Sequence, residues 1–224
     1  MSESASAAVA PKVTAPQDSI LPQVVRVAWL SIALGIALEV VLLVLAAFTG
    51  TAGESGRPAL ADLAQKISWS FLVCVGLAFG TAARKIREVV MGGLGFLAAP
   101  LAFVAAKAIH KGLGQALGTI APGAPFTFPL LIAGLKALEY GALGALLGYA
   151  SQRNKSLAFH ATAGIATGLT FGLLIVWAGV RAQAGPVGAV DLASRAINEV
   201  LFPLGCSLVI FASEAFGRRI KGAG

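Results

Sequence analysis

Charged residues are scarce in this 224-residue chain. Lys, Arg, Asp and Glu together make up 12% of it, whereas 57% of its residues are hydrophobic and the mean hydropathy is +0.84. Soluble domains usually contain about 25% charged residues. Because so little polar surface would not solvate a water-soluble fold of this size, the composition predicts an integral membrane protein.

Cysteine is rare and the common catalytic motifs are missing. Cys74 and Cys206 lie in separate apolar runs and no CxxC pair occurs, which favours small buried residues over a disulfide or a metal site. The sequence also contains no GxxxxGK[ST], GxSxG or HExxH motif. We therefore expect no metal site and no cofactor, and the sequence gives no reason to expect an enzyme.

Long apolar runs are what the chain contains instead. A helix needs about 20 residues to cross the roughly 30 Å hydrocarbon core of a bilayer. Six runs are long enough, at 27–49, 67–83, 89–106, 126–150, 157–180 and 196–216. The runs are continuously apolar, whereas strands of a membrane barrel alternate. The predicted fold is an all-α membrane protein: a disordered cytoplasmic tail at 1–22 and a single six-transmembrane-helix bundle at 23–224.

The basic residues predict the orientation of this bundle. The net charge is +7, with 17 Lys and Arg against 10 Asp and Glu, but the basic residues lie between apolar runs, which indicates insertion signals and no nucleic-acid partner. The side that holds both termini carries ten basic residues against six, including RKIR at 84–87 and GRRIK at 217–221. The positive-inside rule then predicts a multi-pass protein of a bacterial inner membrane with both termini in the cytoplasm.

The histidines and tryptophans have characteristic positions in this topology. His110 and His160 lie near opposite membrane faces, too far apart to ligate one haem iron within a single chain. A packed or helix-capping role is expected for His160. Trp29, Trp69 and Trp177 lie toward helix ends, as interfacial anchors do.

Weak internal similarity suggests a duplicated unit. Halves at 23–106 and 126–216 would each hold three helices and would insert in opposite orientations, as in many transporters. GLAFG at 76–80 resembles GLTFG at 168–172. In a chain rich in Ala, Leu and Gly such matches also arise by chance, so the sequence leaves both explanations open.

Three charged residues lie deep inside predicted helices. Glu39 is twelve residues into the first helix, Glu139 has a similar depth in the fourth, and Lys136 lies one turn before Glu139. A charge at the bilayer centre costs about 2.5–3.5 kcal/mol, so such residues are paired, protonated or exposed to water. We predict a midplane polar site of Glu39, Lys136 and Glu139, with Tyr140 and Glu199 as further substrate or ion ligands.

Two interpretations of these charges remain open. Glu39 and Glu139 could line a polar cavity in which one of them carries a coupling proton, or Lys136 could form a permanent interhelical ion pair that fixes helix register. Asp191, Arg195 and Glu199 recur every four residues and form one stripe. This stripe is either an exposed, self-paired turn or the outer vestibule of a pathway.

Small residues also recur at helical spacing, which indicates close helix contacts. The glycines concerned are Gly144, Gly148, Gly164, Gly168 and Gly172. The spacing does not distinguish packing within the bundle from dimerisation.

These observations support two main hypotheses about function, and a third, a membrane-embedded enzyme or redox subunit that acts on a lipid or quinone, ranks below them because the usual catalytic residues are missing. The first is a small transporter or channel of the bacterial inner membrane, with the polar site at its centre and an unidentified small molecule or ion as substrate. The second is a non-catalytic membrane subunit of a larger complex, either the substrate-capturing component of an ATP-driven importer or an assembly factor. The expected partners are the lipid bilayer and either a second copy of the chain or another membrane subunit.

Overall fold

A computed structural model describes residues 20–50, 56–83, 85–123, 129–183 and 185–222. Over these ranges the protein consists of six helices and contains no strand: α1 Leu21–Phe48, α2 Gly56–Gly80, α3 Arg87–Ala116, α4 Leu130–Gln152, α5 Leu157–Arg181 and α6 Ala189–Gly222. All six are long and apolar enough to cross a membrane. The predicted all-α fold with six helices of membrane-spanning length and apolarity is therefore confirmed over these ranges, and it supports a multi-pass membrane protein. Residues 1–19 of the predicted tail lie outside the described residues.

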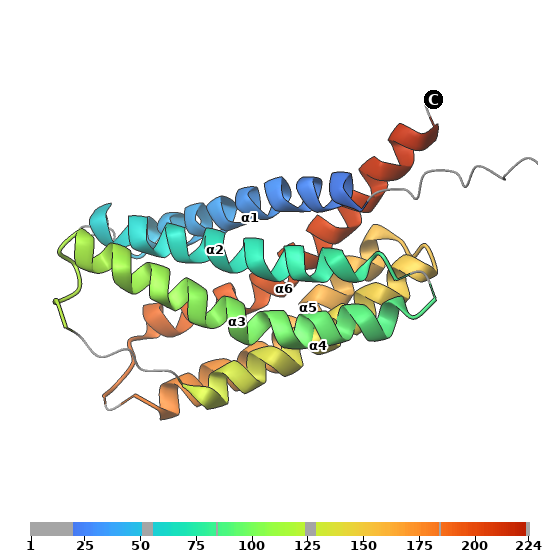
Figure 1. The fold of residues 1–224 in the computed structure, drawn as a ribbon. Coiled ribbons are helices and arrows are strands. Elements are labelled where there is room, and N and C mark those ends of the chain that lie inside the picture. Colours follow the sequence, from blue (N-terminus) through green and yellow to red (C-terminus); the bar gives the residue numbers. More distant parts are fainter. Residues whose placement is uncertain (1–19, 51–55, 84, 124–128, 184, 223–224) are drawn as a thin grey trace, which may run out of the picture.

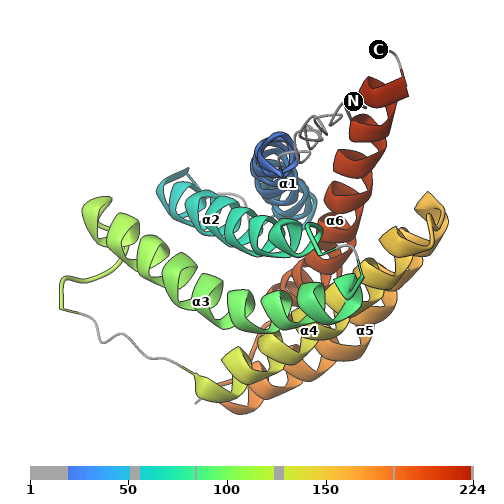
Figure 2. The same cartoon turned by 45° about the vertical axis from the view of Figure 1, so that its right-hand side comes forward.

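The helices form a ring in chain order (Figures 1 and 2). Each packs against the next along the chain, and α1 also packs against α6, which closes the ring. In addition, α2, α4 and α6 contact one another across the interior. The interior is thus built mainly by the even-numbered helices.

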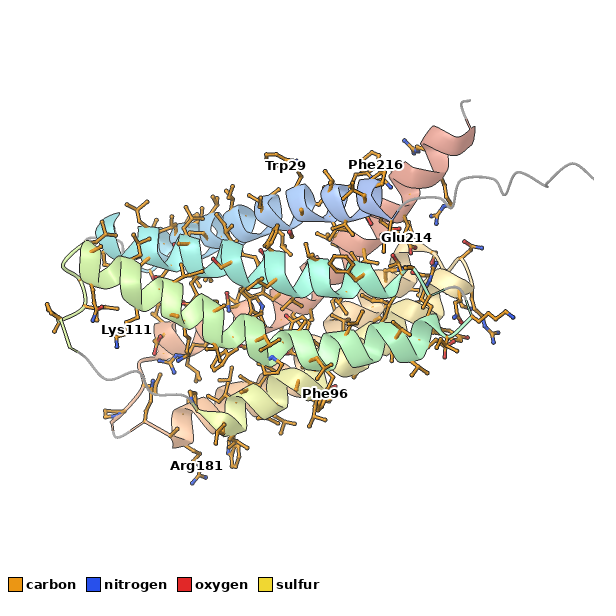
Figure 3. All side chains as sticks on the ribbon, in the orientation of Figure 1. Trp29, Phe96, Lys111, Arg181, Glu214 and Phe216 are labelled. Atoms are coloured by element: carbon orange, nitrogen blue, oxygen red, sulfur yellow. The ribbon has the colours of Figure 1, made fainter. Side chains whose placement is uncertain are left out.

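The two ends of the bundle differ. At one end, here called the long-loop end, the chain passes from α1 to α2, from α3 to α4 and from α5 to α6 (Figure 1). The other end, here called the turn end, holds the connections from α2 to α3 and from α4 to α5, the start of α1 and the end of α6. Figure 3 shows Lys111 and Arg181 at the long-loop end and Glu214 toward the turn end.

Several helices extend beyond their apolar runs at the long-loop end. α2 begins at Gly56, where the sequence predicts 67, and α3 continues to Ala116, where it predicts 106. α6 begins at Ala189, where it predicts 196. The extensions contain polar and charged residues that pair with one another and line a cavity, and hydropathy alone cannot distinguish such residues from a loop.

The glycine stripe of α5 packs against α6 of the same chain. A Cβ atom added at Gly164 would lie 2.6 Å from the Cα atom of Leu204, and one at Gly168 would lie 2.8 Å from that of Val200. Gly144 and Gly148 approach the backbone of α3 in the same way. These glycines let neighbouring helices come together within the bundle.

The outer surface is strongly apolar. Trp29 on α1 is 70% exposed, and Phe96 on α3 also projects outward (Figure 3). Trp177 on α5 is exposed as well. Such a surface suits a lipid environment, because a soluble protein rarely exposes contiguous apolar faces of this kind.

The interior contacts do not show the predicted inverted repeat. That repeat relates α1 to α4, α2 to α5 and α3 to α6. The helices that meet in the interior are α2, α4 and α6, so α2 and its proposed counterpart α5 have different environments. The inverted repeat stays a prediction.

Candidate functional site

A cavity of about 300 Å³ lies at the long-loop end, between α1, α2, α3, α4 and α6. It is lined by Leu42, Asp62, Gln65, Lys66, Trp69, Phe103, Ala106, Lys136, Asp191, Ser194, Arg195, Asn198, Glu199 and Phe202. Its volume suits a small molecule, at the lower end of typical ligand pockets. Charges of both signs and aromatic rings share the same wall.

Four aromatic rings from four helices meet beside this cavity, and three of them, Trp69, Phe103 and Phe202, line it. Trp69 on α2 makes edge-to-face contacts with Phe103 on α3, Tyr140 on α4 and Phe202 on α6, with ring centroids 5.5–6.4 Å apart. We call these four residues the aromatic floor. Trp69 is only 6% exposed, so its predicted role as an interfacial anchor is wrong. It lies inside the bundle because α2 begins well before its apolar run and places Trp69 opposite α4 and α6.

One lysine holds two carboxylates beside this floor. The Nζ atom of Lys136 lies 2.9 Å from Oε2 of Glu139 and also donates to Oε2 of Glu199 on α6. It lies 5.3 Å from the centroid of the Trp69 ring. We call Lys136, Glu139 and Glu199 the carboxylate–lysine cluster. Glu139 is fully buried, and the cluster holds two carboxylates for one ammonium group.

The local sequence explains how this cluster assembles. Lys136 and Glu139 are three residues apart on α4, so their side chains share a helix face. Glu199 lies where α6 packs closely on α5, since a Cβ atom at Gly172 would be 2.9 Å from the Cβ atom of Glu199. The last glycine of the α5 stripe therefore makes room for a residue of the site.

Glu39 belongs to a different ion pair. Its Oε2 atom lies 2.5 Å from Nζ of Lys66 on α2, and both side chains are largely buried. The structure thus brings together Lys136, Glu139, Tyr140 and Glu199 of the predicted site, and it places Glu39 with Lys66. Lys66 also lines the cavity.

The partners share one depth in the bundle. Glu39 lies nine residues before the end of α1, and Lys66 lies ten residues after the start of α2. Glu139 and Glu199 lie nine and ten residues after the starts of α4 and α6. At 1.5 Å per residue, all four are about 14 Å from the long-loop end, near the middle of a span. This depth of Lys66 depends on the start of α2 at Gly56, so the predicted helix from 67 does not show it.

The cavity mouth carries an exposed ion pair and a contact between a histidine and a carboxylate. Nη2 of Arg195 lies 2.9 Å from Oδ2 of Asp191, four residues earlier on α6. On the opposite wall, Nε2 of His110 lies 3.1 Å from Oδ1 of Asp62. In the predicted stripe, Asp191 and Arg195 therefore pair with each other at the surface, whereas Glu199 reaches the buried cluster.

Besides Oε2 of Glu39, which faces Lys66, two carboxylate or amide oxygen atoms that are buried near the cavity have no hydrogen-bond partner among the described residues. They are Oε1 of Glu139 and Oδ1 of Asn198, both acceptors. The hydroxyl of Tyr140 is also without a hydrogen bond there. An unsatisfied buried polar group typically costs about 1–3 kcal/mol, which a bound donor or water molecule would offset.

Packed side chains fill the interior between the aromatic floor and the turn end. Cys74, Leu77, Cys206 and Ile210 are all fully buried there. The two thiols are free, and their sulfur atoms lie 3.0 Å apart.

The turn end has its own buried and partly buried polar contacts. Nη1 of Arg87 on α3 lies 3.4 Å from Oε1 of Glu214 on α6. His160 on α5 is buried, and its Nδ1 atom lies 3.0 Å from the carbonyl oxygen of Ser156. The bundle is therefore open toward the long-loop end and packed toward the turn end.

Comparisons with protein families, curated proteins and solved structures found no match. In the described ranges, no group of three or more His, Cys, Asp or Glu residues has the arrangement of a metal site. A functional argument therefore depends on the chemistry of the cavity and its buried charges.

Proposed function

We propose that this chain is a small proton-coupled transporter of a bacterial inner membrane, with both termini in the cytoplasm. Its substrate binds in the cavity at the long-loop end, and the carboxylate–lysine cluster exchanges the coupling proton. The observation that carries this proposal is that Glu139 and Glu199 share one ammonium group at the inner part of a cavity.

The charge balance of the cluster supplies the coupling. Lys136 neutralises only one of its two carboxylates, and excess negative charge is unfavourable away from water. A proton or a bound cation removes this excess. Binding of a cation in the cavity and protonation of the cluster both neutralise the second carboxylate, so each affects the other.

The cluster members have different positions and hence different roles. Glu139 is fully buried and suits a residue that holds a proton. Glu199 lines the cavity and is able to contact a substrate. Lys136 links the two carboxylates and lies over the Trp69 ring, so displacement of its ammonium group would be transmitted to the aromatic floor.

The filled turn end favours a carrier over a channel. A channel needs a continuous polar path, whereas Cys74, Leu77 and Cys206 pack tightly beneath the aromatic floor. Arg87 and Glu214 link α3 to α6 at that end. A carrier would open this end and close the cavity mouth in alternation. The Glu39–Lys66 pair then serves to hold α1 on α2.

Reconstituted liposomes test this function. Uptake of radiolabelled benzylguanidinium, 3-phenylpropanoate and phenylalanine, a cation, an anion and a zwitterion of similar size, is measured with and without an imposed pH gradient. We expect uptake of at least one probe to depend on the gradient, and to lose this dependence in Glu139→Gln. The control is Glu88→Gln, a carboxylate at the turn end.

Two results would reject the proposal. Uptake that is equal with and without the gradient would reject proton coupling. Absence of uptake for all three probes, with stable co-purification of other polypeptides, would favour the non-catalytic membrane subunit.

A further inference from the structure

The charges around the cavity leave a surplus of carboxylates. Its three lining cations already have carboxylate partners: Lys66 with Glu39, Arg195 with Asp191, and Lys136 with Glu139 and Glu199. Asp62, also on the wall, pairs with a histidine. The lining itself holds three carboxylates and three cations. With Glu39 and Glu139 behind it, and with Lys107 over the Phe103 ring, the set holds five carboxylates and four cations, a surplus of one carboxylate.

Two of the unsatisfied polar groups near the cavity are acceptors only, and the third, the Tyr140 hydroxyl, both donates and accepts. Oε1 of Glu139 and Oδ1 of Asn198 are buried acceptors without a hydrogen-bond partner among the described residues. An ammonium or guanidinium group carries N–H donors and no acceptor, so it would satisfy such atoms. A carboxylate ligand would add further acceptors beside them.

The aromatic floor already accommodates cations on its ring faces. Nζ of Lys136 lies 5.3 Å from the Trp69 centroid, and Nζ of Lys107 lies 5.2 Å from the Phe103 centroid. These distances are in the range of cation–π interactions. The remaining ring surface, including Phe202, offers apolar contacts to the rest of a ligand.

We infer that the substrate is a small organic monocation that carries N–H donors on an ammonium or guanidinium group, together with an apolar portion. This inference rests on the proposed transport function, since it names the substrate class of the same cavity. The cationic group would bind Glu199 and the acceptor of Asn198, and the apolar portion would lie on Trp69 and Phe202. The surplus negative charge would repel an anion. A zwitterion would add a carboxylate that finds no free donor beside these acceptors.

Binding is measured through the fluorescence of Trp69. The sequence contains three tryptophans, and Trp29 and Trp177 are exposed on the outer surface, so a Trp29→Phe/Trp177→Phe background leaves Trp69 as the single reporter. Benzylguanidinium, 3-phenylpropanoate and phenylalanine are titrated into this protein in nanodiscs. We expect benzylguanidinium to bind at least about tenfold more tightly than the other two, the difference of one charge-assisted hydrogen bond.

Two variants locate the binding. In the same background, Glu199→Gln is expected to weaken benzylguanidinium binding by about tenfold. Asp62→Asn is expected to weaken it by a smaller factor, and because the Asp62 side chain is 47% exposed this change should leave folding intact. Glu88→Gln, remote from the cavity, is the matched control. Unchanged affinity in both Glu199→Gln and Asp62→Asn would overturn the inference.

The remaining outcomes separate this inference from the transport function. Equal or tighter binding of 3-phenylpropanoate or phenylalanine, or no binding of any probe, overturns the cation class. Gradient-driven uptake of the anion or zwitterion alone keeps the transport function and overturns the cation class. Selective benzylguanidinium binding without uptake supports the cation class and rejects the transporter.

Discussion

The sulfur atoms of Cys74 on α2 and Cys206 on α6 lie 3.0 Å apart, although 132 positions separate these residues in the chain. Both side chains are fully buried. The contact lies where the interior is packed, between the aromatic floor and the turn end. A disulfide has an S–S distance of about 2.05 Å, so a small approach of the two helices would allow the bond to form.

We predict that diamide, a two-electron thiol oxidant, links these cysteines and arrests transport. Each disulfide formed releases two protons and two electrons, which reduce diamide to the hydrazine. Since α2 and α6 would then be joined in the packed region, that end would no longer open. The measurement is mass spectrometry for the loss of two hydrogens, with uptake assayed in parallel and restored by dithiothreitol.

Cys206→Ser provides the control for this experiment. It keeps the size of the side chain and removes the partner thiol, so diamide should leave its uptake unchanged. Full alkylation of both thiols in diamide-treated, denatured wild-type protein would show that the bond does not form.

Lys136→Met should be the most damaging change in the carboxylate–lysine cluster. It leaves Glu139 and Glu199 close together without their ammonium group, and breaking a buried ion pair typically costs about 3–5 kcal/mol. The double variant Lys136→Met/Glu139→Gln removes one of these carboxylates and should recover part of the loss. Thermal unfolding in detergent, followed by size-exclusion chromatography, measures both. A double variant no more stable than Lys136→Met would contradict the charge-balance argument.

Much of this architecture could be predicted from the sequence, because apolar length alone indicates membrane-spanning helices. The depth of Glu39, Lys136 and Glu139 could also be counted along the predicted helices. Which helices lie next to one another could not be predicted from the sequence, since nearly every face of these helices is apolar and the hydrophobic pattern does not show which face lies inward. The sequence therefore offers Lys136 as the lysine partner of Glu39, whereas in the structure Glu39 pairs with Lys66.

The aromatic floor was missed for a related reason. The sequence predicts an interfacial anchor at Trp69 because its apolar run begins at 67. In the structure, α2 starts at Gly56, so Trp69 lies about 20 Å along the helix and inside the bundle. Polar residues before an apolar run are able to continue a helix when they face other polar groups, and hydropathy does not distinguish this case from a loop.

Glu39→Gln should reduce stability while uptake remains dependent on the pH gradient. The change leaves Lys66 without its carboxylate, which typically costs about 1–3 kcal/mol for a buried polar group. Lys66 lines the cavity, where water is able to solvate its ammonium group, so the loss should be smaller than for Lys136→Met. Thermal unfolding and liposome uptake are the measurements. Loss of gradient dependence in folded Glu39→Gln protein would instead place Glu39 in the coupling mechanism.

Gly168→Ala should destabilise the bundle through the contact between α5 and α6. The new Cβ atom would lie 2.8 Å from the Cα atom of Val200, which is backbone and cannot rotate away. Overpacking of this kind typically costs about 1–3 kcal/mol. Gly179→Ala on the same helix is the matched control, because its Cβ atom would have no atom within 4 Å and alanine favours the helix. A lower unfolding temperature for Gly168→Ala, with an equal or higher one for Gly179→Ala, is expected. Equal unfolding temperatures for the two variants would mean that the α5 stripe does not set the spacing that brings Glu199 to Lys136.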